Sequence, residues 1–479
     1  AMSLSQALNQ FAQNLGRYLT LRKTAAILGA LALMGLSACG SSDQQSKGVT
    51  DTKADKGLDV LGDAVQYDPN HLVNEGKPIT LQYYTWMPDT DGAVDALNEY
   101  TKIHPNVTFD IVNVAWADYF TKLPMLLKGK NGPAIFSIHN SYDKVLKPYL
   151  AAYDIDVADL EKDYVGVSAH VDGGKVYYID AAINTGNIYY NKTLWAEAGL
   201  TDEDIPTTWD EFRDVAIKLT KRDGDTLTQC GYNMNGDAGY SSLFEGLNYQ
   251  KGKLLFDEKG TDVNFANQTT EENLQWLSDL YAKDKVCSVD FGIDGDKSFG
   301  NGQTAMVYRW GYFEGDLTTK YPNIEYGIFP TPTPSDDVPF AYDRYNGEST
   351  IGINKNTSQQ KQEIAQDIVR FMLADDTYVK TVSKNMNSFP AKNSLNNDSE
   401  LKQMAIFDLV KPRVDRLIWP GPMPATIENT AKVVQQNIFN NGMSISDAVI
   451  DGQEKMASDL KKSNFKSVEA QYAHIDELK

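Results

Sequence analysis

The sequence predicts an α/β protein with mostly parallel sheets and more than one domain. From Pro78 onward, short apolar strands alternate with helical patterns, which is typical of parallel sheets flanked by helices. The chain has 479 residues, too many for one typical hydrophobic core. Aromatic residues also follow successive strands, and ligands of open α/β sheets bind at the carboxyl ends of the strands. A binding surface is therefore expected at that edge.

The elements of the first half follow in order. Alternating apolar residues in ITLQYYTW predict a strand over 79–86, and AVDALNEYTKIHP predicts a helix that ends before Pro105. VTFDIVNV predicts the second strand, ADYFTKLPMLLKGK the next helix, and PAIFSIH the third strand. Trp86, Trp116 and Tyr142 follow these three strands. Because parallel strands end at one edge, the three aromatics are expected to meet there as an exposed ligand surface.

The second half repeats this alternation. Residues 182–192 predict a strand and turn, and residues 193–200 predict a short helix closed by Gly199. Another helix begins in PTTWDEF, where Thr208 is the expected cap and Glu211 completes a capping box. Three further tryptophans lie on apolar helical faces and are expected in the core, namely Trp195, Trp209 and Trp276.

The N-terminal residues have the features of a secretory signal. Arg22 and Lys23 precede the apolar run TAAILGALALMG, which is too short to span a bilayer comfortably. The following LSAC resembles a bacterial lipobox, which implies removal of residues 1–38 and a lipid on Cys39. A plain signal peptide with an incidental cysteine is the alternative. Residues 39–76 are poor in aromatics and are expected to form a flexible tether.

Charge and cysteine content narrow the possible partners. The formal net charge of -20 argues against nucleic acid and anionic lipid as partners. Cys230 and Cys287 are the only cysteines besides Cys39. In an exported protein they form either a disulfide or two buried thiols, and their spacing does not decide between these.

An ordered set of motifs resembles the extracellular solute-binding proteins of carbohydrate ABC transporters. These motifs are NTGNIYYNKTLWAEAGL with PTTWDEF, KSFGNGQTAM with VYRWGY, GESTIGINKN, and NNGMSISDA. The resemblance covers about residues 78–465 and includes the maltose/maltodextrin-binding proteins. It implies a two-lobed periplasmic-binding-protein-like fold of type II with a multi-segment hinge. Lobe 1 would contain residues 77–182 and 348–395, and lobe 2 residues 183–347 and 396–479.

The resemblance also implies a function. The protein would capture an oligosaccharide between its lobes and deliver it to the permease subunits of an importer. It would be exported and held at the outer face of the bacterial cytoplasmic membrane only by the lipid on Cys39. We expect a monomer that needs no metal and no cofactor and is not an enzyme.

Sugar chemistry suggests which residues bind. A pyranose offers an apolar C–H face for stacking and a rim of hydroxyls for hydrogen bonds. Asp89 has a second interpretation as a helix cap, and Arg309 as half of a structural ion pair. The expected stacking residues are Trp86, Trp116, Trp310 and Trp419; the expected hydroxyl contacts are Asp89, Asn140, Tyr142, Tyr240, Arg309, Asn346 and Glu348.

Two other classes of function compete with this hypothesis. The same fold binding a polyamine or a peptide would use acidic residues such as Asp89, Asp118 and Glu348, and ferric iron would need clustered tyrosines. A secreted glycoside hydrolase would use a pair of carboxylates. The sequence has no G-x-S-x-G and no H-E-x-x-H motif, and its five histidines are scattered. The number of tryptophans near strand ends favours sugar.

Overall fold

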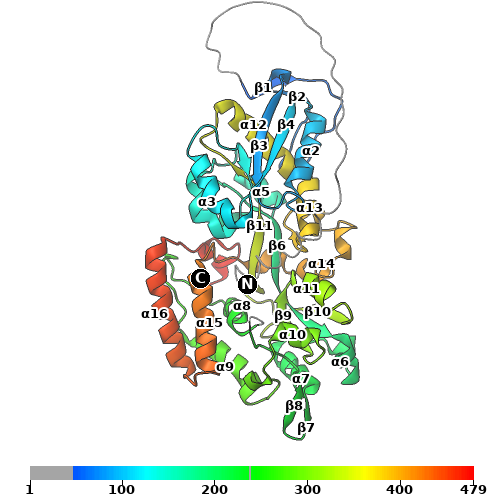
Figure 1. Ribbon diagram of the computed structural model, residues 1–479, viewed down its shortest axis with the longest axis vertical. Coiled ribbons are helices and arrows are strands. Elements are labelled where there is room, and N and C mark those ends of the chain that lie inside the picture. The colour runs from blue at the N-terminus through cyan, green and yellow to red at the C-terminus, as the bar shows by residue number, and fades with distance from the viewer. Residues whose placement is uncertain (1–46, 237–238, 479) are drawn as a thin grey trace, which may run out of the picture.

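The computed structural model describes residues 47–236 and 239–478. The expected signal segment 1–38 and Cys39 lie outside these residues. Over the described part of the chain, none of the helices has both the length and the apolar character needed to cross a membrane. Figure 1 shows two α/β bodies along the long axis of the molecule, with strands β6 and β11 running between them.

The first body contains a four-stranded sheet in the order β12-β5-β3-β4. The strands pair in parallel except for β12 and β5, which are antiparallel, and Leu81, Tyr83 and Thr85 of β3 are buried as their alternation predicts. The strands are β3 (Ile79–Thr85), β4 (Val107–Asn113), β5 (Ile135–Phe136) and β12 (Gly352–Ile353). The helices are α2 (Ala93–Ile103), α3 (Trp116–Leu127), α4 (Asp143–Leu146), α5 (Val157–Asp163), α12 (Gln359–Ala374) and α13 (Thr377–Asn385).

A second sheet joins the two bodies around the long strand β6. Its order is β10-β6-β11-β14, and β9 and β13 also pair with β6. Only the β11–β14 pair is parallel, so the expectation of a mostly parallel second sheet is wrong. The reason is that β6 passes from one body to the other, and the strands that pair with it run in the opposite direction. The strands are β6 (Asp180–Asn191), β9 (Met306–Trp310), β10 (Tyr326–Pro330), β11 (Asp343–Ser349), β13 (Phe389–Pro390) and β14 (Leu417–Ile418).

Helices dominate the second body. Thr208 caps its second helix by accepting a hydrogen bond from the backbone N–H of Glu211 at 3.3 Å, as predicted. The Glu211 carboxylate reaches back to the N–H of Thr207 at 2.9 Å, one residue before the expected partner. The helices are α6 (Lys192–Glu197), α7 (Trp209–Leu219), α8 (Tyr240–Gln250), α9 (Gln268–Ala282), α10 (Gly295–Gly300), α11 (Phe313–Lys320), α15 (Ala425–Phe439) and α16 (Ile445–Ser463), beside the hairpin β7 (Lys221–Asp223) and β8 (Thr226–Gln229).

Each body has its own large hydrophobic core. Trp195 and Trp209 are buried in the second core and Trp276 packs against it, as predicted. Leu401 and the helix α14 (Phe407–Val410) pack into the first core, although the sequence assigned residues 396–479 to the second lobe. The remaining lobe boundaries stay a prediction.

The segment before the first sheet is folded, not flexible, from residue 47 onward. Strand β1 (Val49–Lys53) pairs in antiparallel fashion with β2 (His71–Val73). Val65 and Tyr67 between them are buried in the first core. Residues 47–76 therefore do not belong to the expected tether. Val65, Tyr67 and Val73 are buried against the first body although Leu58 and Val60 are exposed, and composition alone does not reveal this docking.

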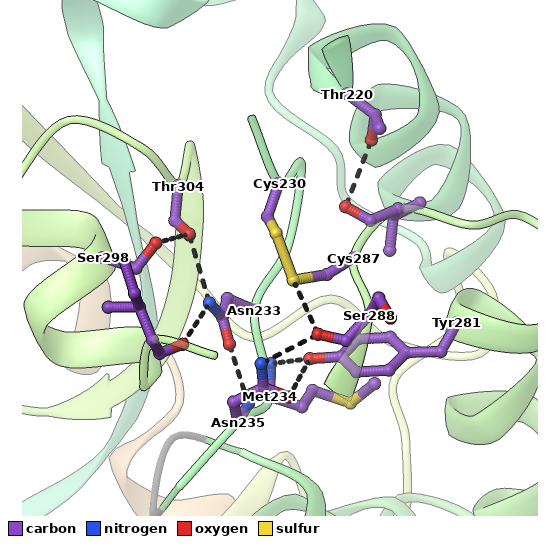
Figure 2. Close-up of a disulfide and its surroundings, with 12 residues drawn as sticks. Thr220, Cys230, Asn233, Met234, Asn235, Tyr281, Cys287, Ser288, Ser298 and Thr304 are labelled. Atoms are coloured by element: carbon purple, nitrogen blue, oxygen red, sulfur yellow. Dashed lines mark hydrogen bonds between the residues drawn. A yellow bond between two sulfur atoms is a disulfide. The ribbon is translucent and has the colours of Figure 1, made fainter. Parts of the chain in front are cut away.

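A disulfide joins Cys230 and Cys287 in the second body, with a Cα–Cα distance of 4.7 Å. Figure 2 shows the bond beside a network of polar side chains. In this network Tyr281 Oη accepts from the N–H of Met234 at 2.6 Å and donates to Asn235 Oδ1 at 3.1 Å. Of the two states that the sequence left open, the structure has the bonded one.

Candidate binding site

The first body presents an aromatic cluster at the carboxyl ends of β3, β4 and β5. We call it the rim cluster, and its members are Trp86, Trp116, Phe120, His139 and Tyr142. Trp86 follows β3, Trp116 opens the helix after β4, and Tyr142 follows β5. The ring centroids of Trp86 and Trp116 are 5.0 Å apart, and those of Trp116 and Tyr142 are 5.6 Å apart. The predicted convergence of three strand ends is therefore confirmed.

Exposure within the rim cluster differs from the prediction. Trp86 is only 7% exposed, because Trp116, Tyr119 and Phe120 surround its indole, so the expectation of an exposed Trp86 is wrong. Trp116 and Tyr142 are half-buried and have ring surface to offer. Tyr142 stacks on Phe120 with a centroid distance of 3.7 Å and an interplanar angle of 1°. Trp86 supports the surface, and Trp116 and Tyr142 present it.

His139 adds a polar group to the rim cluster. Its ring lies 5.2 Å from that of Trp116. Burial lowers the pKa of His139 to about 4, so the imidazole is neutral at neutral pH. Its Nδ1 accepts a hydrogen bond from the N–H of Ser141 at 3.2 Å, which leaves the proton on Nε2. The Nε2–H group of His139 thus adds a hydrogen-bond donor to those of the indoles and of Tyr142 in the rim cluster.

An amide pair connects the rim to the strands that join the two bodies. Asn140, which is 4% exposed, donates from Nδ2 to Asn346 Oδ1 at 2.8 Å and to Gly347 O at 2.9 Å. Both of its amide hydrogens are therefore used within the protein. Among the described residues, no hydrogen bond uses Asn140 Oδ1 or Asn346 Nδ2, so the pair offers an acceptor and a donor, a combination that matches a sugar hydroxyl.

Glu348 brings a carboxylate to the same strand. Its side chain is half-buried, and it has no hydrogen bond or ion pair to the residues that the structure describes. Burial and then the nearby charge of Asp180 raise the pKa of Glu348 to about 7. A carboxyl group in this state can donate to or accept from a hydroxyl at neutral pH.

The second body contributes Trp310 at the end of β9. Trp310 is half-buried and pairs across the sheet with Gly186 of β6. Its Nε1 donates to Tyr308 Oη at 3.3 Å, and Tyr308 in turn donates to Asp343 Oδ2 at 2.8 Å. These bonds hold the indole while leaving part of it exposed.

Three expected contact residues are buried for structural reasons. Arg309 is 6% exposed and its Nε lies 3.1 Å from Asp296 Oδ1, so the ion-pair interpretation holds. Trp419 is 5% exposed because it packs into the first core and stacks on His170 at 4.9 Å. Tyr240 is 1% exposed, and its hydroxyl lies 3.1 Å from Ser278 Oγ inside the second core. The hypothesis that these three side chains face a ligand is wrong for this conformation.

Asp89 is exposed on the turn before α2 and does not cap that helix. Asp91 takes this role, because its Oδ1 accepts from the N–H of Ala93 at 3.0 Å. Neither interpretation of Asp89 is supported by a contact.

Sequence analysis missed a buried polar group beneath the joining strands. Asp180 Oδ2 lies 3.0 Å from His170 Nε2 and receives a hydrogen bond from Tyr345 at 3.2 Å. Asp180 opens β6 and is 2% exposed. Nothing in the sequence marks these residues as a group, since they are far apart along the chain and follow no spacing.

Comparison with known proteins shows the family to which the chain is similar. A family model described as bacterial extracellular solute-binding protein matches residues 85–378. The diacetylchitobiose-binding protein of Streptomyces coelicolor is 25% identical over 356 residues, which cover 70% of this chain and 78% of that protein. The lactose-binding protein of Rhizobium radiobacter is 24% identical over 247 residues, which cover 50% of this chain and 57% of that protein. The match therefore spans only about half to three quarters of these relatives.

Solved structures show the same fold. A cyclo/maltodextrin-binding protein complexed with maltotetraose has a TM-score of 0.66 at 16% identity, covering 80% of this chain and 98% of that chain. The cyclic alpha-maltosyl-1,6-maltose binding protein of Arthrobacter globiformis has a TM-score of 0.64 at 22% identity, covering 80% and 100%. The two-lobed solute-binding fold expected from the sequence is confirmed. These matches are binding proteins and not enzymes.

Proposed function

Because the chain belongs to the family of bacterial extracellular solute-binding proteins, we propose that it is the binding component of an ABC importer and captures an oligosaccharide. The observation that carries this proposal is the rim cluster beside the joining strands. It combines exposed parts of Trp116 and Tyr142 with the polar atoms of His139, Asn140 and Asn346. Aromatic faces with a few fixed polar groups are what a sugar ring needs.

The ligands named for relatives agree with this chemistry. Lactose, diacetylchitobiose and arabinooligosaccharide are the ligands in the names of three similar proteins. Another relative, from Escherichia coli, is named for sn-glycerol-3-phosphate. A phosphate at the joining strands would lie near Glu348 and above the buried Asp180 carboxylate, and negative charge there disfavours an anion. An uncharged oligosaccharide is the better fit.

The proposal also includes the location of the protein in the cell. Export with removal of residues 1–38, a lipid on Cys39 and attachment to the outer face of the membrane would place the protein beside its permease. The permease would receive the sugar when the two lobes close on it. A monomer would suffice for this task.

The first test is thermal unfolding of the full chain with a panel of oligosaccharides, glycerol phosphate, polyamines and short peptides. A ligand of the native state at one hundred times its dissociation constant adds about 2.7 kcal/mol of stability. A shift with one class of oligosaccharide is expected. A shift only with glycerol phosphate, a polyamine or a peptide would overturn the sugar proposal.

The second test asks whether the rim cluster is the site. Trp116→Ala removes a half-exposed ring and is expected to weaken sugar affinity about tenfold or more in isothermal titration calorimetry, equivalent to about 1.4 kcal/mol. Trp276→Ala is the matched control, because Trp276 is also half-buried but packs on Trp209 in the second body. Equal affinity for the Trp116 variant and the wild type would remove the rim cluster from the site.

A further inference from the structure

The folded N-terminal segment 47–73 precedes the part of the chain that matches the family, which starts at residue 85. It lies against α2 and α12 of the first body, at the end of the molecule shown at the top of Figure 1. Its backbone is held by side chains of that body: Glu363 Oε2 accepts from the N–H of Gly48 at 2.7 Å, and Asp163 Oδ2 from the N–H of Val65 at 2.7 Å. The segment is therefore docked on the first body through contacts with side chains outside it.

A polar network centred on Asp367 of α12 fastens the segment. Asp367 Oδ2 accepts hydrogen bonds from Tyr67 at 2.8 Å and from Tyr100 of α2 at 2.7 Å. Asp367 Oδ1 lies 2.9 Å from His71 Nε2 of β2. Tyr67 and His71 belong to the segment, so Asp367 holds it through two side chains.

The contacts of His71 indicate its protonation. Its Nδ1 lies 2.7 Å from the carbonyl oxygen of Asp68, and its Nε2 forms an ion-pair contact of 2.9 Å with Asp367 Oδ1. A carbonyl oxygen and a carboxylate oxygen are both acceptors, and a neutral imidazole has only one N–H, so these two neighbours favour a proton on each ring nitrogen. His71 is therefore an imidazolium paired with a carboxylate in a site that is largely closed to water.

The other groups around His71 are consistent with this assignment. Burial, followed by the charge of Lys56, lowers the pKa of His104 to about 3, so His104 is neutral. Lys56 Nζ lies 2.9 Å from His104 Nδ1, which leaves the His104 proton on Nε2, 2.6 Å from Tyr67 Oη. Lys53 pairs with His71 across the strands, and Asp68 adds a negative charge.

We propose that residues 47–73 form a clasp that doubly protonated His71 fastens to the first body, and that loss of this proton loosens the clasp. A neutral His71 would have one N–H for two acceptors, the Asp68 carbonyl oxygen and the Asp367 carboxylate, and would leave this carboxylate without its paired cation. The buried side chains Val65 and Tyr67 would still favour docking, so the clasp would open more often without unfolding the body.

The direction of the pH effect follows from the pKa of His71. Burial lowers this pKa, but the hydrogen bond to Asp367 and its charge outweigh burial and raise it above the ordinary 6.5. A group whose folded pKa is raised stabilises the docked state fully below its unfolded value, and this stabilisation is lost as the pH rises through the folded value. The clasp is therefore tight in mildly acidic medium and loosens in alkaline medium.

The consequence concerns the length of the tether, and it rests on the proposed lipid on Cys39. With the clasp closed, Lys47 is eight residue-to-residue steps from Cys39, a distance of at most about 27 Å when extended. Release of the segment up to Lys77 gives 38 steps and a limit of about 130 Å. Proton loss would thus let the binding protein move farther from the membrane.

Three donor atoms of His71, His104 and Asp367 lie within 4.8 Å of one another, a spacing that also suits a metal ion. The hydrogen bonds argue against this use. Each of the three groups already has a protein partner, and the Lys56 ammonium at His104 Nδ1 would repel a cation. Zn²⁺ therefore serves as a control in the test.

The test uses the full chain with ¹⁵N-labelled histidine. Imidazole spectra of the five histidines, with His71→Gln for assignment, are expected to show both His71 nitrogens protonated at pH 6. Hydrogen exchange of residues 49–73 at pH 6, 7.5 and 9, corrected for intrinsic rates, reports docking. As the pH rises from the ordinary pKa of an undocked histidine, about 6.5, to the raised pKa of docked His71, protection of this segment is expected to fall by up to about tenfold per pH unit, relative to α7 as the reference, and then to level off.

Variants and controls separate the proton from other causes. His71→Gln is expected to exchange rapidly at pH 6 with little pH dependence, whereas His474→Gln, near the end of the chain, behaves like the wild type. An unprotonated His71 nitrogen at pH 6, or wild-type protection that is equal at pH 6 and 9, would overturn the clasp. A stoichiometric gain of protection on adding Zn²⁺ would overturn it in favour of a metal site. Sugar binding is a separate measurement, so its failure is not confused with these results.

Discussion

At the scale of single residues, the candidate site consists of side chains that present a surface and side chains that support it. Trp116 and Tyr142 are half-buried, whereas Trp86 is enclosed by Trp116, Tyr119 and Phe120. An indole enclosed in this way contributes to stability, and a half-exposed one can contribute to binding. The same division separates Glu348, which has no protein partner among the described residues, from Arg309, which is paired with Asp296.

Glu348 allows a prediction about pH. Because burial raises its pKa from 4.5 to about 7, the folded protein keeps a proton that the unfolded chain has lost. Stability should therefore fall as the pH rises from about 4.5 to 7 and then stay level for this group. Glu348→Gln should show a smaller loss of melting temperature between pH 5 and pH 8, measured by calorimetry.

The control for this prediction is Asp89→Asn, which removes an exposed carboxylate on a turn. It should follow the wild type at both pH values. Asp343 and Glu469 have pKa values raised to about 7 by burial as well, so Glu348→Gln removes only part of the effect. Parallel losses in the Glu348 variant and the wild type would contradict the assigned burial.

At the scale of elements, strands β6 and β11 decide where the parts of the site meet. Their antiparallel register places Glu348 opposite Ala182 and Asn346 opposite Asn184. Gly347 lies between them, and a Cβ atom there would come within 1.9 Å of Asp180 Oδ1. Glycine is required at position 347 because the buried Asp180 side chain occupies the space that a Cβ atom would fill.

Substitution at this position tests the packing. Gly347→Ala should destabilise the protein by about 1–3 kcal/mol in urea unfolding, since the strands must separate or Asp180 must move. Gly315→Ala, on the exposed side of α11 with no atom within 4 Å of the new Cβ, is the matched control. The control should be neutral or stabilising by up to about 1 kcal/mol. Equal stability of both variants would contradict the described register.

The disulfide between Cys230 and Cys287 restrains part of the second body. It closes a segment of 57 residues that contains α8 and α9. In the chain-entropy account, removing it by Cys230→Ser with Cys287→Ser should cost about 4 kcal/mol of unfolding free energy. Cys39→Ser should leave stability unchanged. Peptide mapping without reduction should recover a linked pair containing Cys230 and Cys287, and two separate thiol peptides would contradict the bond.

At the scale of the whole molecule, two hydrophobic cores are joined by strands that pass between them. β6 and β11 connect the bodies, and side chains from both sides approach these strands, as Asn140 does from the first body. Bodies that have separate cores and share only a few crossing strands can move relative to each other by bending at those strands. We therefore expect each body, with its own core, to move as a unit.

Ligand binding should therefore change the overall dimensions. Small-angle scattering is expected to show a smaller radius of gyration when saturating oligosaccharide is added, because the lobes close on it. Trp116→Ala should need about ten times more sugar for the same change. A radius that does not change at saturation, as verified by calorimetry, would mean that binding occurs without closure.

Much of the first body could be predicted from the sequence. Alternation in 79–86 and 107–114 and the helical pattern between them predicted β3, α2 and β4 closely, because local periodicity directly reflects burial on one face. The meeting of Trp86, Trp116 and Tyr142 also followed from the sequence, since parallel strands end at the same edge. The family resemblance supplied the two-lobed fold.

The exposure of these residues and the docking of the N-terminal segment could be seen only in the folded protein. The burial of Trp86, Trp419 and Tyr240 depends on neighbours that are distant in the chain, such as His170 against Trp419. The docking of residues 47–73 depends on Asp367, about 300 residues away. Sequence periodicity reports which face of an element is apolar. Exposure and protonation depend on contacts between elements, and those exist only after the chain has folded.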